Sequence, residues 1–217
     1  MTELNYLQID TGENPETTII WLHGLGANGH DFEPVVPEFE FAKQRPVRFL
    51  FPHAPDLPVT INGGMVMPAW YDILAMDIDR KVDVEQLRRS AKQVAALIQA
   101  ERERGVASEN IILGGFSQGG AVAYELALSY PEPLGGLFAL STYFATADSI
   151  KLSDANRNIP IFIGHGSFDP VVSEVLGQAA LKQLQGLGYE PEYQSYGMEH
   201  SLCLEEIRDL DGFLGGV

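Results

Sequence analysis

The sequence has a single cysteine, Cys203, among its 217 residues. One thiol excludes an internal disulfide and a zinc site built from cysteines. The sequence also has no stretch of about 20 consecutive apolar residues, which excludes a transmembrane helix. The opening segment, MTELNYLQID, lacks the basic and apolar regions of a signal peptide. We therefore expect a cytoplasmic protein without a membrane span.

Basic residues are scarce as well. There are 14 Lys and Arg against 30 Asp and Glu, a net charge of −16. Proteins that bind nucleic acid neutralise its phosphates with Lys and Arg, so this balance argues against a nucleic-acid partner. It argues equally against a polybasic contact with anionic lipids. The remaining composition, 45% hydrophobic and 20% charged, is that of an ordinary globular protein and excludes disorder, collagen and coiled coil.

Apolar runs of strand length alternate with helical patterns along the chain. Strands are expected at Thr18–Leu22, Arg48–Phe51, Asn110–Gly114, Leu137–Ser141, Ile159–Gly164 and Glu192–Tyr196. Most of these runs are continuously apolar, as in strands of a parallel sheet that helices cover on both faces. Because no repeat or composition shift interrupts the pattern, it predicts one doubly wound α/β domain over residues 1–217.

The clearest helix is Val84–Arg104, whose apolar residues recur at three- and four-residue spacing. Further helices are expected at Phe32–Lys43, Gln118–Ser129, Glu174–Gly186 and Leu202–Leu214. The segment 52–73 breaks the rhythm, because it is rich in proline, glycine and large apolar residues. We interpret this segment as a packed loop that offers apolar side chains to a ligand, although those side chains could equally cap the core.

A G-x-S-x-G motif, Gly115 to Gly119, lies between an expected strand and an expected helix. This is the context of a nucleophile elbow, a tight turn that lifts a serine hydroxyl above the sheet at a helix N-terminus. Glycine on both flanks avoids collisions with the neighbouring strand and helix. Ser117 is therefore the candidate nucleophile, with a purely structural Gly-Ser-Gly turn as the alternative.

A serine nucleophile needs a base, and the base needs an orienting carboxylate. In this architecture the three follow in the order serine, acid, histidine. His200, which follows the last expected strand, is the candidate base on order and position. Asp169, in a glycine-bearing loop at the carboxyl end of a strand, is the candidate acid. Weaker candidates for the acid are Asp148, Asp154 and Glu199. The histidines expected to be structural or at the surface are His23, His30, His53 and His165.

A tetrahedral intermediate needs two preorganised N–H donors. One is expected from Gln118, directly after the serine, and the other from Leu25, in the glycine-rich loop after the first expected strand. That loop, Gly24 to Gly29, also matches the G-x-G-x-x-G pattern of dinucleotide sites. The next strand lacks the acidic residue that such sites use, so no nucleotide cofactor is expected. No metal is expected either, because no metal-ligand spacing such as H-E-x-x-H occurs.

Four blocks of the sequence together resemble the phospholipase/carboxylesterase family, which includes acyl-protein thioesterases and small bacterial carboxylesterases. The blocks are His23-Gly24-Leu25-Gly26, Gly115-Phe116-Ser117-Gln118-Gly119-Gly120, Asp169-Pro170-Val171-Val172 and Gly197-Met198-Glu199-His200. The segment Val59–Ile73 is also similar, most of all to the bacterial carboxylesterases. The resemblance covers nearly the whole chain. Ser173, where the family often has proline, is a small departure that leaves the triad intact.

The resemblance implies an α/β-hydrolase fold with a mostly parallel central sheet, helices on both faces and no large lid domain. It implies Ser117, Asp169 and His200 as the catalytic triad, with the Leu25 and Gln118 N–H groups as the oxyanion hole. It also implies that the loop Thr60–Trp70 shapes the acyl site, and it is compatible with a homodimer. The residues expected to contact the acyl chain are Thr60, Met65, Met67, Trp70 and Val172.

These observations predict a serine carboxylesterase that hydrolyses small-molecule esters of short to medium acyl chains through an acyl-enzyme. An acyl-protein thioesterase or lysophospholipase with the same triad is the alternative, since the family spans all three substrate classes. A hydrolase-fold module that only binds its ligand is a further alternative, because fold alone does not establish activity. Cys203 is close to His200 in sequence but has no elbow, so we expect a buried apolar residue on a helix rather than a nucleophile.

Overall fold

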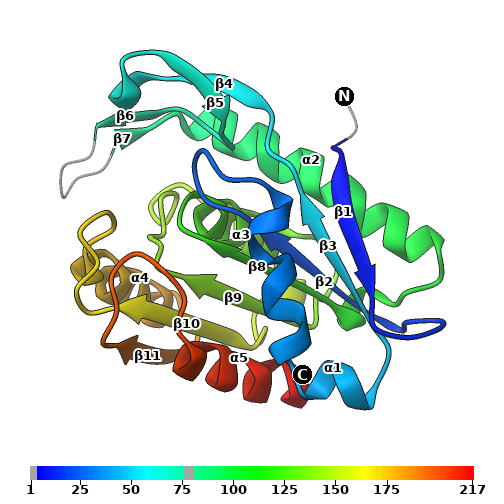
Figure 1. The fold of residues 1–217 in the computed structure, drawn as a ribbon. Helices are drawn as coiled ribbons and strands as arrows, with labels where there is room; N and C mark the ends of the chain where they lie inside the picture. Colours follow the sequence, from blue (N-terminus) through cyan, green and yellow to red (C-terminus); the bar gives the residue numbers. More distant parts are fainter. Residues whose placement is uncertain (1–3, 76–80) are drawn as a thin grey trace.

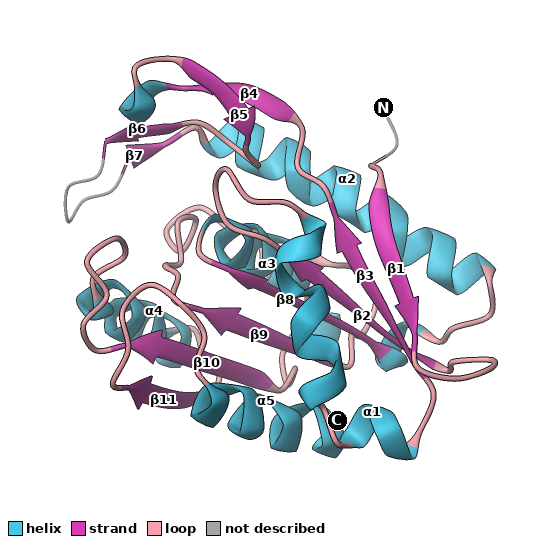
Figure 2. Ribbon diagram, viewed as in Figure 1, coloured by secondary structure: helices cyan, strands magenta, loops and turns pink. Residues whose placement is uncertain are grey.

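The computed structural model describes residues 4–75 and 81–217 and contains a seven-stranded central sheet (Figures 1 and 2). Its strand order is β1-β3-β2-β8-β9-β10-β11. The strands are β1 (Tyr6–Asp10), β2 (Thr17–Leu22), β3 (Val47–Pro52), β8 (Ile111–Phe116), β9 (Gly136–Leu140), β10 (Ile161–Gly166) and β11 (Glu192–Tyr196). Neighbouring strands are parallel except β1, which pairs antiparallel with β3 at the edge. This is the α/β-hydrolase fold that was expected.

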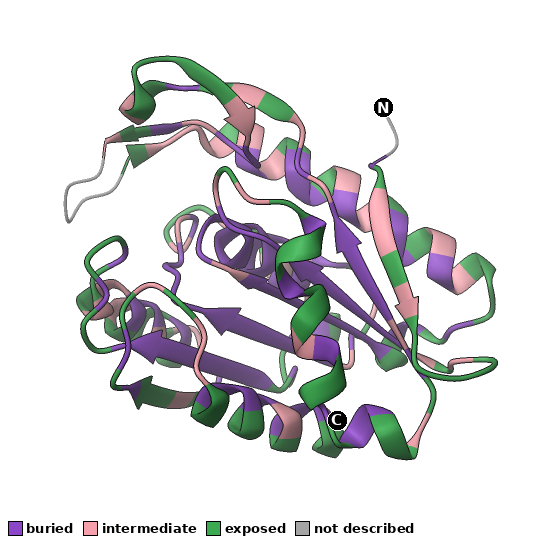
Figure 3. Cartoon of the chain, viewed as in Figure 1, coloured by how far each residue is buried: buried purple, intermediate pink, exposed green. Residues whose placement is uncertain are grey.

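The six expected strands are all present, with bounds within two residues of those predicted. Figure 3 shows the central strands buried along most of their length, which explains why they read as continuous apolar runs. The strand of the central sheet that sequence reasoning missed is β1, whose residues are half-buried or exposed. Because this edge strand is not buried on both faces, its sequence has no continuous apolar run from which a strand could be predicted.

Helices cover both faces of the sheet (Figure 2). The helices α2 (Val84–Glu103), α3 (Gln118–Ser129) and α4 (Glu174–Gly186) share one apolar core with the sheet. The other face is covered by α5 (Leu204–Gly216), the short α1 (Phe41–Gln44) and the 3₁₀ helix η1 (Gly29–Glu38). Two further 3₁₀ turns, η3 (Ser108–Asn110) and η4 (Asp154–Asn156), connect elements. None of the helices in the described part of the chain is long and apolar enough to cross a bilayer.

The expected helix Phe32–Lys43 is wrong as a single element. In its place the structure has η1, which contains Pro34 and Pro37, followed by the one-turn α1. Proline has no N–H to donate and clashes with the preceding turn, so an α-helix cannot run through this segment. The ring of Phe32 nevertheless stacks on Trp21 of β2 at a centroid distance of 4.6 Å, which fixes η1 against the sheet.

The segment 52–73 contains a hairpin rather than only a loop. Strands β4 (Asp56–Val59) and β5 (Met65–Pro68) pair antiparallel, joined by the turn η2 (Thr60–Asn62). The shorter β6 (Ile73–Ala75) and β7 (Lys81–Val82) pair beside them. In Figure 1 these strands project beyond the main sheet on the side where β8, β9 and β10 end. Between β5 and β6 the chain returns to the core, where Trp70 and Tyr71 are fully buried.

Candidate active site

Ser117 lies at the turn between β8 and α3 in a strained backbone conformation. Its φ is 54° and its ψ is −120°, a region that residues with a side chain seldom occupy. Hydrogen bonds from strand β9 and the residues after it fix both the N–H and the carbonyl of Ser117. The N–H of Ser117 donates to the carbonyl of Leu140 at 2.9 Å, and the hydroxyl of Thr142 donates to the carbonyl of Ser117 at 2.6 Å. The turn has the geometry of a nucleophile elbow.

The glycines that flank Ser117 are required by close backbone contacts. A Cβ at Gly119 would lie 2.5 Å from the carbonyl oxygen of Leu22 and 2.6 Å from that of His23. A Cβ at Gly115 would overlap the backbone of Gly119. Both distances are far shorter than a van der Waals contact, and backbone atoms cannot rotate away. The steric reason for the G-x-S-x-G pattern therefore holds in this chain.

Asp169 and His200 form a hydrogen-bonded pair beside this turn. Nδ1 of His200 lies 2.6 Å from Oδ2 of Asp169, whose side chain is fully buried. Oδ1 of Asp169 accepts the N–H groups of Val171 and Val172, each at 2.8 Å. Burial alone would raise the pKa of Asp169, but the hydrogen bonds from His200, Val172 and Val171 outweigh it and lower that pKa. The acid is thus an anion at neutral pH, and it keeps the proton of His200 on Nδ1.

One cavity of about 480 Å³ brings Ser117 and His200 together. Its wall is mostly apolar, as in most small-ligand sites. The residues that complete the wall are Gly24, Leu25, Ala27, Asp31, Phe32, Val35, Phe116, Val171, Ser201 and Leu202. They come from the loop after β2, from η1, from the end of β8 and from the loops after β10 and β11. The three predicted polar residues are therefore assembled at the carboxyl ends of the central strands, where such sites collect.

One of the two predicted oxyanion donors lines this cavity, and the other directly follows Ser117 of its wall. Leu25 lines it, and Gln118 begins α3, where the first N–H groups have no partner within the helix. The loop that carries Leu25 turns at Gly26, whose φ of 75° favours glycine. The Gly26 N–H donates to the carbonyl of Pro68 at 2.8 Å, so the loop is fixed from the β4–β5 hairpin side.

Two of the remaining histidines have buried structural contacts. Nε2 of His23 accepts the N–H of Ala54 at 3.0 Å, so its proton is on Nδ1, 2.7 Å from the carbonyl of Gly24. Nε2 of His165 lies 2.7 Å from the carbonyl of Val172. Burial lowers the pKa of both imidazoles, which keeps them neutral.

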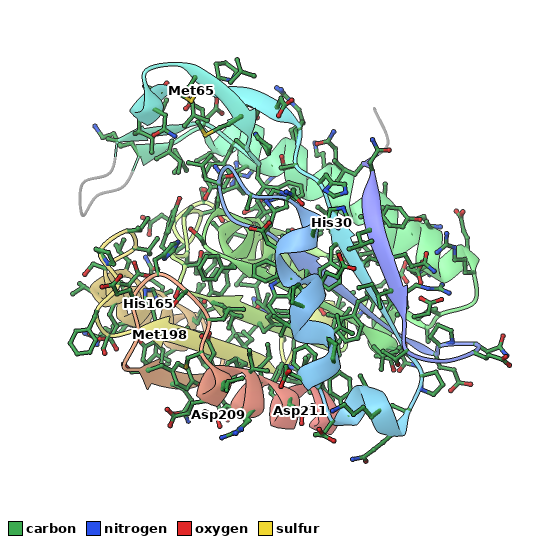
Figure 4. All side chains as sticks on the ribbon, viewed as in Figure 1. His30, Met65, His165, Met198, Asp209 and Asp211 are labelled. Atoms are coloured by element: carbon green, nitrogen blue, oxygen red, sulfur yellow. The ribbon has the colours of Figure 1, made fainter. Side chains whose placement is uncertain are left out.

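None of the residues predicted to contact the acyl chain is among those that line this cavity. Trp70 and Val172 are fully buried, so neither offers a surface to a substrate. Thr60 donates its hydroxyl to Asp72 at 2.6 Å. Met65 is 63% exposed on the projecting hairpin (Figure 4). Met67 is half-buried and reaches toward the loop at Gly26.

The cavity wall contains residues that sequence reasoning did not single out. Phe116, Val171 and Leu202 each lie within two residues of Ser117, Asp169 or His200 in sequence. The ring of Phe116 is 4.6 Å from that of His200. Proximity to the motifs could have identified these three. Phe32 and Val35 gave no comparable signal, because their place depends on how η1 packs.

Cys203 differs from its predicted place. It is half-buried and precedes the first turn of α5, where its Sγ accepts the N–H of Glu206 at 3.5 Å. It is therefore a helix cap rather than a core residue within a helix.

Comparison with known proteins agrees with this geometry. The sequence model of the phospholipase/carboxylesterase family matches residues 4–216. The chain is 40% identical over 208 residues to acyl-protein thioesterase 1 of Gibberella zeae. This match covers 91% of this chain and 88% of the relative. The crystal structure of Arabidopsis thaliana SOBER1 superposes with a TM-score of 0.85 at 33% identity, covering 91% of this chain and 97% of that one. The Bacillus cereus carboxylesterase, at 20% identity and a TM-score of 0.79 over 98% and 94% of the two chains, shares the fold. The chain therefore belongs to the phospholipase/carboxylesterase family, whose members are serine hydrolases with an α/β-hydrolase fold.

Proposed function

We propose that the protein hydrolyses carboxylic esters of short to medium acyl chains, with Ser117, His200 and Asp169 as its catalytic triad. The observation that carries this proposal is the 2.6 Å bond between His200 and Asp169 at a cavity that also exposes the strained Ser117. A binding module would need neither the strain nor the ordered acid and base.

In this proposal each member of the triad has its own role. Asp169 holds the proton of His200 on Nδ1, which leaves Nε2 to accept the proton of Ser117 as its Oγ attacks the acyl carbonyl. The same nitrogen then protonates the leaving alcohol or thiol. Water, deprotonated by Nε2, attacks the acyl-enzyme and releases the acid. Asp169 remains ionised throughout and stabilises the imidazolium.

The negative charge that develops on the carbonyl oxygen requires donors that are already in place. The N–H of Gln118 lies at the N-terminus of α3, where the helix dipole also favours an anion. The N–H of Leu25 is the second donor in this proposal. Loss of one such donor costs about 10²- to 10³-fold in turnover in other hydrolases.

A second candidate substrate class is the S-acyl thioester of a protein. The relatives at about 40% identity are named acyl-protein thioesterase 1, which supports this alternative at least as strongly as the ester. The chemistry is the same, because only the leaving atom changes from oxygen to sulfur. The kcat/KM of an S-acyl cysteine peptide, compared with that of the O-acyl serine peptide of the same sequence and chain, decides between the two.

The proposal is tested with p-nitrophenyl esters from acetate to palmitate. We expect wild-type turnover that is lost in Ser117→Ala and retained in Ser129→Ala, a matched control at the far end of the same helix. A fluorophosphonate should add one adduct to the intact wild type and none to Ser117→Ala. Turnover by Ser117→Ala at the wild-type rate would refute the assignment, and a wild type without turnover or adduct would favour a binding module.

A further inference from the structure

The side chain of Gln118 links the proposed oxyanion hole to the hairpin. It is fully buried, and its amide makes two hydrogen bonds to the return segment, residues 68–71, which leads from β5 back to the core. Oε1 accepts the N–H of Trp70 at 2.8 Å, and Nε2 donates to the carbonyl of Tyr71 at 2.6 Å. Both ends of one amide are thus occupied by adjacent residues of one segment.

The same return segment also holds the loop of the other donor. The carbonyl of Pro68 accepts the N–H of Gly26 at 2.8 Å. The indole N–H of Trp70 donates to the carbonyl of His23 at 2.9 Å. These two bonds fall on either side of Leu25, the second proposed donor. The return segment is therefore bonded to the residues around one donor and to the side chain of the other.

These four bonds matter because the Leu25 loop has little rigidity of its own. Its glycines allow several backbone conformations, and Gly26 is held in the left-handed one. An oxyanion hole works only if its donors are held within about 0.5 Å of the productive position. A segment bonded both to the Leu25 loop and to the side chain of Gln118 fixes the spacing between the two N–H groups.

Glutamine suits this place for a chemical reason. Its amide both accepts from an N–H and donates to a carbonyl, which the two neighbouring peptide groups require. Glutamate could accept from Trp70 but would set its second carboxylate oxygen against the carbonyl of Tyr71. Methionine has a similar length and can make neither bond at full strength.

We propose that the Gln118 side chain and the return segment are a positioning unit that sets the geometry of the oxyanion hole and couples it to the hairpin. The inference rests on the proposed function and adds a positioning role for the side chain of a residue whose backbone is a proposed donor. A merely structural clamp would affect stability alone, whereas a positioning unit affects the transition state more than the ground state.

The test compares Gln118→Met with Gln86→Met. Gln86, on α2, is a matched control, because its Oε1 accepts the N–H of Asp72 at 2.8 Å, directly after the return segment, without contacting the elbow. With concentrations of active enzyme set by fluorophosphonate titration, we expect Gln118→Met to lower kcat by about 10- to 100-fold while KM changes less than about threefold. We expect Gln86→Met to lower the melting temperature with kcat near the wild-type value.

A second readout is the binding of a trifluoromethyl ketone, which places an oxyanion in the hole. Its affinity should fall in Gln118→Met by about the factor lost in kcat/KM and should not fall in Gln86→Met. If Gln118→Met does not fold, Gln118→Asn carries the same comparison, because it keeps a neutral amide of the same chemistry but is one methylene too short to bond both Trp70 and Tyr71.

Equal kcat values for folded Gln118 variants and wild type would overturn the inference. So would equal losses of kcat in the variants of Gln118 and Gln86. In either case an active wild type would leave the proposed function standing. A wild type that neither turns over esters nor labels at Ser117 would instead overturn the proposed function, and this inference with it.

Discussion

Asp169 and His200 are 31 residues apart in sequence and are joined by a 2.6 Å hydrogen bond between Oδ2 and Nδ1. The two carboxylate oxygens of Asp169 have different hydrogen-bond partners. Oδ2 orients the imidazole, while Oδ1 accepts two backbone N–H groups of its own loop. The loop can therefore keep its shape even when the contact with His200 is changed.

The substitution Asp169→Asn separates the bond to His200 from the bonds that hold the loop. An asparagine can keep its oxygen toward the loop N–H groups, but its amide nitrogen then faces His200 and cannot accept a hydrogen bond from the N–H at Nδ1. The imidazole would turn to the opposite tautomer, with Nε2 protonated and unable to accept from Ser117. We expect kcat to fall by about 10³- to 10⁴-fold with little change in melting temperature. Asp148→Asn, at an exposed rival acid, should retain wild-type kcat, and equal kcat values for the two variants would contradict the assignment.

The glycines of the elbow give a prediction on stability. Gly119→Ala places a methyl group 2.5 Å from the carbonyl oxygen of Leu22, which is backbone and cannot move without shifting β2. We expect a loss of about 1–3 kcal/mol in the free energy of unfolding, together with loss of activity. Gly212→Ala in α5 is the control, because nothing lies within 4 Å of its Cβ. That variant should be stabilised by up to about 1 kcal/mol. Chemical denaturation of both variants checks the prediction, which fails if Gly119→Ala is as stable as wild type.

Sequence reasoning could find the sheet and the proposed triad because their signals are local. Buried parallel strands are continuously apolar. The elbow is a motif of five residues, and close contacts such as that between Gly119 and Leu22 require its glycines. His200 and Asp169 follow strand ends, where the chain order and the topology of the sheet limit the choice. The fold and the polar residues at the cavity were therefore accessible without coordinates.

The walls of the cavity could not be found in this way. Trp70 was expected at the substrate surface on its chemistry, but its N–H groups are used to hold Gln118 and His23. The wall is formed partly by η1, which was expected to be an α-helix, and its Phe32 reaches the site because it stacks on Trp21. Such placements depend on packing between segments that are distant in sequence, and no local pattern encodes them.

Buried Glu206 predicts a dependence of stability on pH. Its side chain is fully buried on α5 against Gly164 of β10, and neither carboxyl oxygen has a hydrogen-bond partner among the described residues. Burial, and then the charge of Asp209, raises its pKa from 4.5 to about 8. Between these values the unfolded chain releases a proton that the folded chain retains. The contribution of protonated Glu206 to the free energy of unfolding is therefore complete below pH 4.5 and is lost as the pH rises through about 8.

The substitution Glu206→Gln removes this ionisation. Relative to wild type, the variant should gain stability as the pH is raised from about 5 to 9, by a few kcal/mol at the upper end. Glu205→Gln, at the exposed neighbouring position on α5, should leave the slope unchanged. The measurement is the melting temperature of the three proteins against pH. Parallel curves for wild type and Glu206→Gln would show that Glu206 does not titrate in this range.

The charge of the cavity predicts a preference among leaving groups. Asp31 is the only carboxylate among the residues that line the cavity in the described chain, and no Lys or Arg is among them. Together with a net charge of −16, this favours a substrate whose alcohol carries a positive charge.

The test of this preference compares a choline ester with its uncharged 3,3-dimethylbutyl isostere, which has the same shape. Because Asp31 is exposed and water weakens its field, Asp31→Asn should lower the ratio of their kcat/KM values by only about two- to fivefold, and salt should reduce the effect. Glu38→Gln makes the same charge change on η1 outside the cavity wall and should leave the ratio unchanged. If both variants shift the ratio equally, the preference comes from the overall charge of the protein and not from Asp31.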